Sequence, residues 1–504
     1  LPPTKTRTPS PAPTPTAEEP GMTATNTAEP TATPTEAAVT LPEVMGPDEF
    51  PAGVNPLTGM LVEEPDLLDL PAVLISITNF PVSARPQAGL SFASHVYELF
   101  IGKGQTRFLV VFYGVYPHLA YTPANCPVEE MSFEGEGVLV GDFVWMDDNA
   151  NGVQDENEAG FPQVCVHLMD PATHEILAKT GSDETGAYQF LVEPGREYYL
   201  QFIKPLHINY TTANLGTDDR EDSDVDSQGV TREFLVTEEV LRWDVGLVGG
   251  SDPIVPIGPV RSGRVSYAQV QPRYPGSCMV FAGASEEVGK IVSSCVRPYG
   301  TDEDDINSAY FSVTNLRQLA EDGKESNEEY VYTGNQFSQT PPEDGQDAET
   351  VLMFYNLLNQ TQWVYDEEAG GYLRSTDKAD GTGIFSPGLD RLTAEQLVYQ
   401  NVVVLFAEHT AYKPTVIDLD MAFTRGRALI FRNGIAYDVL WDTTNQAYEQ
   451  ETGRLRPVRF TGKDGNPFPL APGQTWIHIV TDITQAWEES PGSWKIRFYA
   501  PPGS

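Results

Sequence analysis

Basic residues are scarce in this chain of 504 residues. It holds 31 lysines and arginines against 72 aspartates and glutamates, which gives a formal net charge of −41. A surface of this sign repels nucleic acids and anionic lipid headgroups, so neither is an expected partner. Apolar runs of about 18 residues are missing as well, so no membrane-spanning helix is expected. No signal peptide is visible at the first residues, which suggests a trimmed mature form.

Cysteine is also rare, with four residues that lack the C-x-x-C spacing of zinc or redox sites. In an oxidising compartment they can form two disulfides, and the sequence alone leaves all three pairings open. We favour Cys278–Cys295, because a strand and the helix after it would bring these two together, which leaves Cys126 with Cys165. Free buried thiols are the alternative.

The first 40 residues lack aromatic side chains and contain 9 prolines and 12 threonines. Such a tract cannot bury enough apolar surface to fold, and its prolines keep it extended. We therefore expect residues 1–50 to be a disordered stalk or spacer, with a plain disordered tail as the alternative. Both fit an exported protein.

Two regions after the stalk predict a mixed α/β (α+β) host domain. Residues 71–80 and 106–114 have the composition of buried strands, and 91–100 is expected to be a short helix between them. A Gly/Pro linker at 249–259 leads to the strand CMVFAG. An amphipathic helix, ASEEVGKIVSSCV, is expected next, with Val288 and Ile291 on its apolar stripe.

Between these two regions the chain is strongly acidic, with 23 acidic and 6 basic residues over 136–248. Short alternating strands separated by turns predict a small all-β sandwich inserted into the host. The last third is strand-rich, and Asn433-Gly434 between apolar runs predicts a β-hairpin. The expected organisation is stalk 1–50, host 51–135, inserted sandwich 136–249, host 250–345 and strand-rich part 346–504.

The segment DDNANGVQDENE carries the most specific motif. Counting Asp147 as position 1, oxygen-bearing side chains fall at positions 1, 3, 5, 9 and 12, and a glycine falls at position 6. This is the spacing of the twelve-residue calcium loop, and calcium prefers six to eight oxygen ligands. The flanks have strand character, so an EF-hand helix pair is not expected. The predicted ligands are Asp147, Asn149, Asn151, Asp155, Glu158 and the carbonyl of Val153.

A second acidic segment, TDDREDSDVD, concentrates five aspartates, whose carboxylates repel one another unless a cation neutralises them. It is interpreted as a less defined second calcium site, with a solvated acidic loop as the alternative. Its predicted ligands are Asp218, Asp219, Asp222, Asp224 and Asp226.

The segments VGDFVWMDDNANGVQDENEAGFPQVCVHLMD, TGSDETGAYQF, GTDDREDSDVD and WDVGL closely resemble the B-like repeat of staphylococcal serine–aspartate surface adhesins. The resemblance covers about 136–248. It implies an immunoglobulin-like sandwich that calcium makes rigid, used as a spacer on a cell surface. Some relatives carry a Lys–Asn isopeptide bond, which is not expected here because the first strand contains no lysine.

The flanking parts resemble a second family, the YerB-type bacterial lipoproteins. The motifs are NPLTG, ARPQAGLSFASHVYE, TRFLVVF, IGPVRSGR, NGIAYDVLW and LAPGQTWIHIV, in the order of that family. The inserted module between TRFLVVF and IGPVRSGR departs from its pattern. The resemblance implies export on a lipid anchor, which would lie outside this chain, and a two-part fold; it implies no reaction.

These motifs contain charged residues that suggest a ligand pocket in the host. Arginine presents a rigid fork suited to carboxylate or phosphate groups, so an anionic fragment of a wall polymer is a candidate ligand. The alternative is an internal network of ion pairs. The residues are Arg85, Glu98, Arg107, Arg261 and Arg264.

No catalytic motif accompanies them. The seven histidines occur in neither H-E-x-x-H nor a nucleophile elbow, and His95 is expected to be structural. The expected function is therefore a non-catalytic, extracytoplasmic surface or envelope protein, a calcium-stabilised spacer or binder of a wall polymer or surface protein. A cell-envelope enzyme or receptor with an arginine-lined pocket is the alternative.

Overall fold

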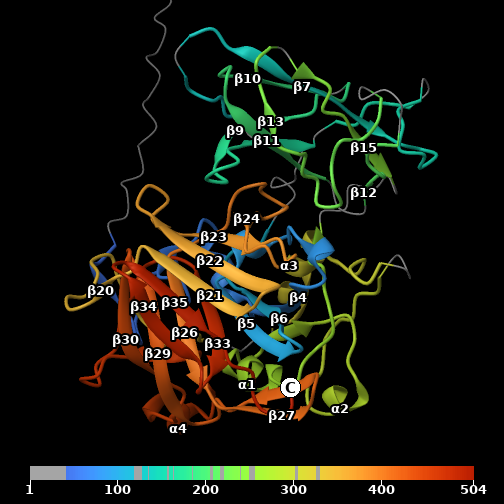
Figure 1. Ribbon diagram of the computed structural model, residues 1–504. Coiled ribbons are helices and arrows are strands. Elements are labelled where there is room, and N and C mark those ends of the chain that lie inside the picture. Colours follow the sequence, from blue (N-terminus) through green and yellow to red (C-terminus); the bar gives the residue numbers. More distant parts are fainter. Residues whose placement is uncertain are drawn as a thin grey trace, which may run out of the picture. The chain divides into compact units, whose positions relative to one another are not determined.

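The fold is taken from a computed structural model of the chain (Figure 1). The structure describes residues 41–504 apart from 118–125, 127, 134, 156, 157, 163, 184, 205–207, 216–220, 239, 249–255, 301–304 and 325–329. Residues 1–40 of the expected stalk lie outside the described residues. The described part, 41–50, contains strand β1, Val44–Met45, which pairs with β19, Gln336–Ser338, of the host. Within the described residues, no helix is long and apolar enough to cross a membrane.

One large sheet joins the parts of the host that are distant in sequence. Its order is β17-β4-β6-β5-β33-β26-β29-β30-β20, and β31 also pairs with β30. The junction is a parallel pairing of residues 95–99 in β5 with 475–479 in β33, so the host segments before and after the insertion share one sheet. The strands are β4 Val73–Thr78, β5 His95–Gly102, β6 Gln105–Phe112, β17 Cys278–Val280, β20 Gln346–Asp347, β26 Asn401–Ala407, β29 Arg425–Arg432, β30 Ile435–Asp442, β31 Arg459–Thr461 and β33 Thr475–Thr481.

A second host sheet, in the order β24-β23-β22-β21-β35-β34 with β25 on β23, shares a core with the first. Phe108 and Trp476 of the large sheet belong to the same buried cluster as Trp363 and Ile496 of the second sheet. The strands are β21 Thr350–Asn356, β22 Asn359–Asp366, β23 Gly371–Asp377, β24 Phe385–Pro387, β25 Val398–Tyr399, β34 Gln485–Ser490 and β35 Ser493–Arg497. The predicted hairpin is confirmed: β29 and β30 meet at Asn433 and Gly434, whose positive φ angles of 52° and 72° suit this turn.

The mixed α/β character expected of the host is not confirmed, because strands dominate it and its described helices are short. The predicted helix at 91–100 is a short 3₁₀ turn, Leu90–Phe92, followed by strand β5. Every residue of β5 is buried, so both of its faces are covered and the alternation that marks a strand is absent.

The predicted amphipathic helix after β17 is also wrong. Only α2, Glu286–Gly289, forms, and Ile291 is 56% exposed. The chain turns back instead, since the Cys295 amide donates to the Met279 carbonyl at 2.9 Å. The longest described helix is α3, Val313–Asp322; α1 is Tyr267–Val270 and α4 is Ala447–Thr452.

The inserted region forms two sheets with one core, the sandwich that the acidic strands predict. One sheet has the order β10-β7-β15-β12 with β14 on β7, and the other β13-β11-β8-β9. Side chains of both sheets, among them Val140, Val166 and Leu200, pack around the fully buried Trp243. The strands are β7 Val138–Met146, β8 Cys165–Met169, β9 Ile176–Gly181, β10 Ala187–Val192, β11 Glu197–Ile203, β12 Asn209–Tyr210, β13 Phe234–Leu235, β14 Val240–Leu241 and β15 Val245–Val248.

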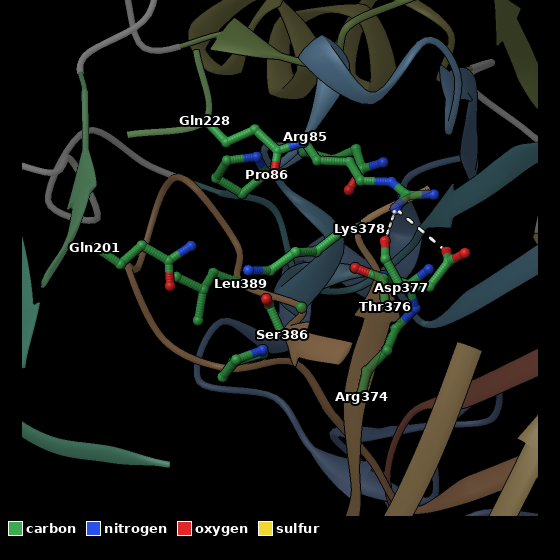
Figure 2. A pocket seen from close by; sticks show the side chains of 13 residues that line it. Arg85, Pro86, Gln201, Gln228, Arg374, Thr376, Asp377, Lys378, Ser386 and Leu389 are labelled. Atoms are coloured by element: carbon green, nitrogen blue, oxygen red, sulfur yellow. Dashed lines mark hydrogen bonds and ion pairs between the residues drawn. The ribbon is translucent and has the colours of Figure 1, made fainter. Parts of the chain in front are cut away.

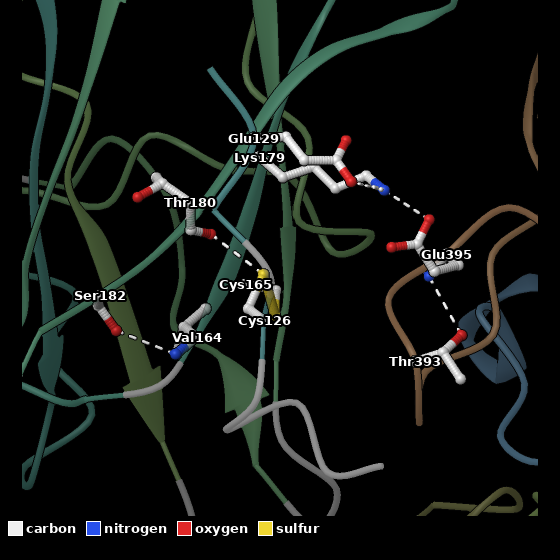
Figure 3. Close-up of a disulfide and its surroundings, with 9 residues drawn as sticks. All are labelled: Cys126, Glu129, Val164, Cys165, Lys179, Thr180, Ser182, Thr393 and Glu395. Atoms are coloured by element: carbon white, nitrogen blue, oxygen red, sulfur yellow. Dashed lines mark hydrogen bonds and ion pairs between the residues drawn. A yellow bond between two sulfur atoms is a disulfide. The ribbon is translucent and has the colours of Figure 1, made fainter. Parts of the chain in front are cut away.

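The module begins earlier in the chain than the expected residue 136. Glu129 forms an antiparallel bridge with Lys179 of β9, and its carboxylate lies 3.4 Å from the Lys179 ammonium (Figure 3). Cys126 is bonded to Cys165 of β8, with Cα atoms 5.5 Å apart. In the host, Cys278 is bonded to Cys295 at a Cα distance of 5.7 Å.

Candidate functional site

The predicted calcium loop follows β7 and is organised around the buried carboxylate of Asp147. This carboxylate accepts hydrogen bonds from the amides of Asn151 (3.1 Å) and Gly152 (2.8 Å) and from the Thr211 hydroxyl (2.5 Å). Gly152 has a φ of +78°, and a Cβ there would lie 2.6 Å from the Thr212 carbonyl oxygen. The sharp turn at position 6 therefore requires glycine.

The remaining predicted ligands of this loop lie close together. The side-chain amides of Asn149 and Asn151 donate to one carboxylate oxygen of Asp155, at 2.7 and 3.0 Å. The Glu158 carboxylate closes the loop by accepting from the amides of Asp148 (2.9 Å) and Asp155 (3.1 Å). The loop thus gathers its oxygen-bearing side chains in a network of internal hydrogen bonds.

The second acidic segment lies beside this loop. Val153 forms an antiparallel bridge with Asp222, and the Gln154 amide donates to the Glu221 carbonyl at 2.6 Å. Asp222 and Asp224 are buried, whereas Asp226 is exposed and caps its own turn through the Val230 amide at 3.0 Å. Asp218 and Asp219 fall outside the described residues.

Sequence reasoning missed a further buried acid, Asp244, just before β15. It is 1% exposed, its amide donates to Asp224 at 2.9 Å, and its Oδ2 has no hydrogen-bond partner. Burial, reinforced by the negative charges of Asp142 and Asp224, raises the pKa of Asp244 to about 9. The sequence offered one indication of its role, because Asp244 belongs to the WDVGL segment that resembles the B-like repeat. Among the described residues, no three Asp, Glu, His or Cys side chains have a metal-binding arrangement.

The five residues of the predicted host pocket do not form one site. In the register of the large sheet, Arg107 is opposite Leu99 and Thr78, whereas Glu98 is opposite Phe108. Successive side chains of a strand point to opposite faces, so Arg107 and Glu98 lie on different faces of the sheet. The sequence groups these residues because they occur in the motifs of one family, and such motifs do not show on which face of a sheet a side chain lies.

Glu98 belongs to an enclosed network in the core. It is fully buried and accepts hydrogen bonds from the Thr106 hydroxyl (2.7 Å) and the Trp476 indole (3.1 Å), and it lies 3.2 Å from His478 Nδ1. Burial by itself would raise the pKa of Glu98, but His478 and Arg374 hold it below its usual value. Trp363 in turn donates to His478 Nε2 at 3.0 Å, so Glu98 belongs to an internal hydrogen-bond network with Arg374 nearby.

Arg85 is also paired. Its guanidinium donates to the Asp377 carbonyl at 2.8 Å and lies 3.8 Å from the Asp377 carboxylate (Figure 2). It also stacks on Phe80. Asp377 and the buried Arg374 help to line a cavity of about 40 Å³, with room for little more than water. Arg374 stacks on Trp476 at 4.6 Å.

Arg107, Arg261 and Arg264 form the remaining group, which we call the arginine cluster. Arg107 is 3% exposed, and the other two are half-buried. Burial, together with the charges of Arg264 and Arg261, lowers the pKa of Arg107 to about 9, although Tyr267 opposes this shift. Three of the five predicted residues therefore come together, and Arg85 and Glu98 do not join them.

Known proteins resemble separate parts of this chain. Residues 138–247 match the SdrD B-like domain, and residues 57–121 and 351–477 match the N-terminal and C-terminal domains of a protein family of unknown function, DUF3048. The serine-aspartate repeat-containing protein F of Staphylococcus epidermidis is 44% identical over 107 residues, 21% of this chain and 6% of that protein. Protein C of Staphylococcus aureus (strain Newman) is 46% identical over 85 residues, 17% of this chain and 9% of that protein.

This chain thus spans less than a tenth of the length of those relatives. Among solved structures, the YerB protein of Bacillus subtilis is similar, with 19% identity and a TM-score of 0.45, over 84% of this chain and 96% of that one. The two DUF3048 matches flank the SdrD B-like match, as the two host segments flank the sandwich. The chain combines an SdrD B-like domain with a divided DUF3048, or YerB-like, region.

Proposed function

We propose that this protein acts outside the cytoplasm, at the cell surface or in the envelope, as a non-catalytic spacer or binding protein. Its inserted sandwich would be stabilised by calcium. The SdrD B-like match and the similarity to serine-aspartate repeat-containing proteins support the surface role. The resemblance of the host to YerB-type lipoproteins supports attachment by a lipid anchor.

The observation that carries this proposal is the gathering of oxygen atoms in the Asp147–Glu158 loop. Asp147 and Glu158 bracket the loop, and Asn149, Asn151 and Asp155 lie within hydrogen-bond distance of one another. Calcium takes six to eight oxygens at about 2.3–2.6 Å in flexible geometries, so small rotations of these side chains would suit it. Magnesium demands a tighter octahedron and keeps more of its water.

The neighbouring acids support a cation for a second reason. Asp222, Asp224 and Asp244 bury carboxyl groups near one another, and carboxylates in such a place repel each other unless a cation neutralises them. The bridge between Val153 and Asp222 connects this group to the loop. A bound cation would therefore fasten the end of β7 to the segment 221–226 and stiffen that end of the sandwich.

Thermal unfolding of the full chain, with calcium or with a chelator, tests the proposal. A ligand that binds only the folded state stabilises it, by about 2.7 kcal/mol at a concentration 100 times its Kd. Calcium at about 5 mM should therefore raise the Tm of the module's transition, since extracellular modules bind calcium with Kd up to about 1 mM. An unchanged Tm at saturating calcium would contradict the proposal.

The variant Asp147→Asn should lose most of the calcium-dependent rise in Tm. Asp464→Asn is the matched control, because Asp464 is an exposed carboxylate in a host turn, where it accepts from the Asn466 amide at 3.0 Å. The control should keep the full rise. Equal responses of the two variants would place the calcium effect elsewhere in the chain.

A second candidate function is binding of an anionic wall-polymer fragment by the host. The arginine cluster favours it, because none of its three guanidiniums forms an ion pair with a carboxylate in the described part of the chain.

A further inference from the structure

The arginine cluster is built on main chain that is fixed from both sides. Arg107 belongs to β6, whereas Arg261 and Arg264 belong to the segment 257–266, which runs along β4. The Arg261 amide donates to the Ser76 carbonyl at 2.9 Å, and the Arg261 carbonyl accepts from the Ala282 amide at 3.0 Å. The positions of the three arginines are therefore set by the sheet and not by a mobile loop.

The guanidiniums use few of their hydrogen-bonding groups. Arg107 donates to the Ser262 carbonyl at 3.2 Å, Arg264 to the Thr415 carbonyl at 3.4 Å, and Arg261 to the Ile306 carbonyl. The Nε atom of each arginine is buried and has no hydrogen-bond partner among the residues that the structure describes. Each guanidinium has five N–H donors, and leaving buried donors unsatisfied is unfavourable, so this group has unused capacity for an acceptor.

Two buried arginines elsewhere in the host pair with a carboxylate. Arg456 and Arg459 share the buried carboxylate of Glu449, with Arg456 Nε 2.9 Å from Glu449 Oε1, and Arg459 also lies 3.7 Å from Asp442. The charge of Asp305 acts on Arg261, but the two form no ion pair in the described part of the chain. The cluster therefore brings three guanidiniums together without a carboxylate ion pair among the described residues, in a chain whose net charge is −41.

We propose that Arg107, Arg261 and Arg264 form a binding site for the dianionic phosphate group of a phosphate monoester. A dianion offsets the positive charge of the cluster, and its oxygens suit the planar forks of the guanidiniums. Arg261 and Arg264 are half-buried and reachable from solvent, and Arg107 lies buried within the group. Ser76 and Tyr267, whose hydroxyls bond to each other at 2.7 Å, complete the polar surroundings. This site is independent of the proposed calcium site.

Isothermal titration of the full chain with inorganic phosphate tests the site, without added calcium so that no calcium phosphate forms. Phosphate should bind with a stoichiometry of one, whereas acetate at the same ionic strength should not bind measurably. Dimethyl phosphate, a monoanionic diester, should bind more weakly than phosphate. Absence of phosphate binding, or equal binding of acetate, would overturn the proposal.

The double variant Arg261→Gln/Arg264→Gln should weaken phosphate binding roughly tenfold or more, since two charged donors are lost. Both side chains are half-buried, so this variant should fold, which the Tm would verify. Arg427→Gln is the matched control, because Arg427 is an exposed arginine of β29 paired with Asp438 at 3.1 Å. The control should bind like the unmodified chain, and equal binding by the double variant would overturn the assignment.

Discussion

The inserted sandwich and the host concentrate charge of opposite sign. The sandwich buries Asp222, Asp224 and Asp244 beside a loop of oxygen-bearing side chains. The host buries Arg107 and holds two more arginines near it. In both regions ionisable groups of one kind lie close together, and burial makes their charged forms costly unless a partner neutralises them. The two proposals accordingly assign a cation to the sandwich and an anion to the host.

Other buried arginines of the host have different surroundings. Near α4, the buried carboxylate of Glu449 pairs with Arg456 and Arg459. On the opposite face of the large sheet, Arg374 lies near the buried carboxylate of Glu98. The arginine cluster has no carboxylate ion pair in the described part of the chain, and neither have the buried Arg273 and Arg432, whose guanidiniums donate to carbonyl oxygens.

The largest expected effect is the loss of unfolding free energy when the disulfide of either region is removed. The replacement Cys126→Ser/Cys165→Ser opens a sequence separation of 39 residues in the sandwich, and Cys278→Ser/Cys295→Ser opens one of 17 in the host. Loop-closure entropy predicts losses of about 4 and about 3 kcal/mol, respectively. Urea unfolding followed region by region would measure them. If both replacements destabilised the same unfolding transition, the sandwich and the host would unfold as one cooperative unit.

The next effect compares the two faces of the large sheet. Glu98→Gln removes the buried carboxylate that accepts from Thr106 and Trp476 and lies near the buried Arg374, so we expect a loss of about 3 kcal/mol in the free energy of unfolding. Arg107→Met removes a buried charge that has no described ion-pair partner, so its cost should stay within about 1 kcal/mol. Urea unfolding without phosphate measures both. Similar losses for the two variants would contradict the distinction between compensated and uncompensated charge.

The smallest effect concerns neutral buried histidines, one in each region. Burial lowers the pKa of His95 to about 4 from its ordinary 6.5, partly offset by its bond to the Leu57 carbonyl. The unfolded chain therefore binds a proton that the folded chain does not, and host stability is complete above pH 6.5 and declines toward pH 4. The slope is at most about 1.4 kcal/mol per pH unit.

Host unfolding should thus cost about 2 kcal/mol less at pH 5 than at pH 6.5 through His95, and His95→Gln should remove this contribution. His167 of the sandwich has a pKa of about 3, and both of its ring nitrogens lack hydrogen-bond partners in the described part of the chain. The stability of the sandwich should therefore keep decreasing below pH 4, where the effect of His95 on the host has levelled off. A His95→Gln variant with an unaltered pH profile would show that His95 is not the titrating group.

The sequence predicted features that depend on local spacing and missed those that depend on packing. The twelve-residue loop and the hairpin at Asn433-Gly434 are encoded by neighbouring residues, and both segments form compact turns. The helix expected at 91–100 failed because β5 is covered on both faces, so its apolar residues carry no period of two. Periodicity cannot distinguish such a strand from a buried helix.

The candidate sites show the same limit. Nothing in the spacing revealed that Glu98 and Arg107 lie on opposite faces, because that follows from the turn between β5 and β6 and from their register. Asp244 was overlooked because its surroundings come from segments distant in sequence: its carbonyl accepts from the Asp224 amide at 2.8 Å. The grouping of Arg107 with Arg261 and Arg264 depends on the chain returning beside β4 after the insertion.

Hydrogen–deuterium exchange of the full chain, with calcium and with phosphate added separately, tests the opposite charge preferences most directly. Calcium should slow amide exchange in peptides covering 138–162 and 221–248 and leave β6 and 257–267 unchanged. Phosphate should slow exchange in β6 and 257–267 and leave the sandwich unchanged. Calcium without effect on the sandwich, or both ions protecting the same region, would contradict the account.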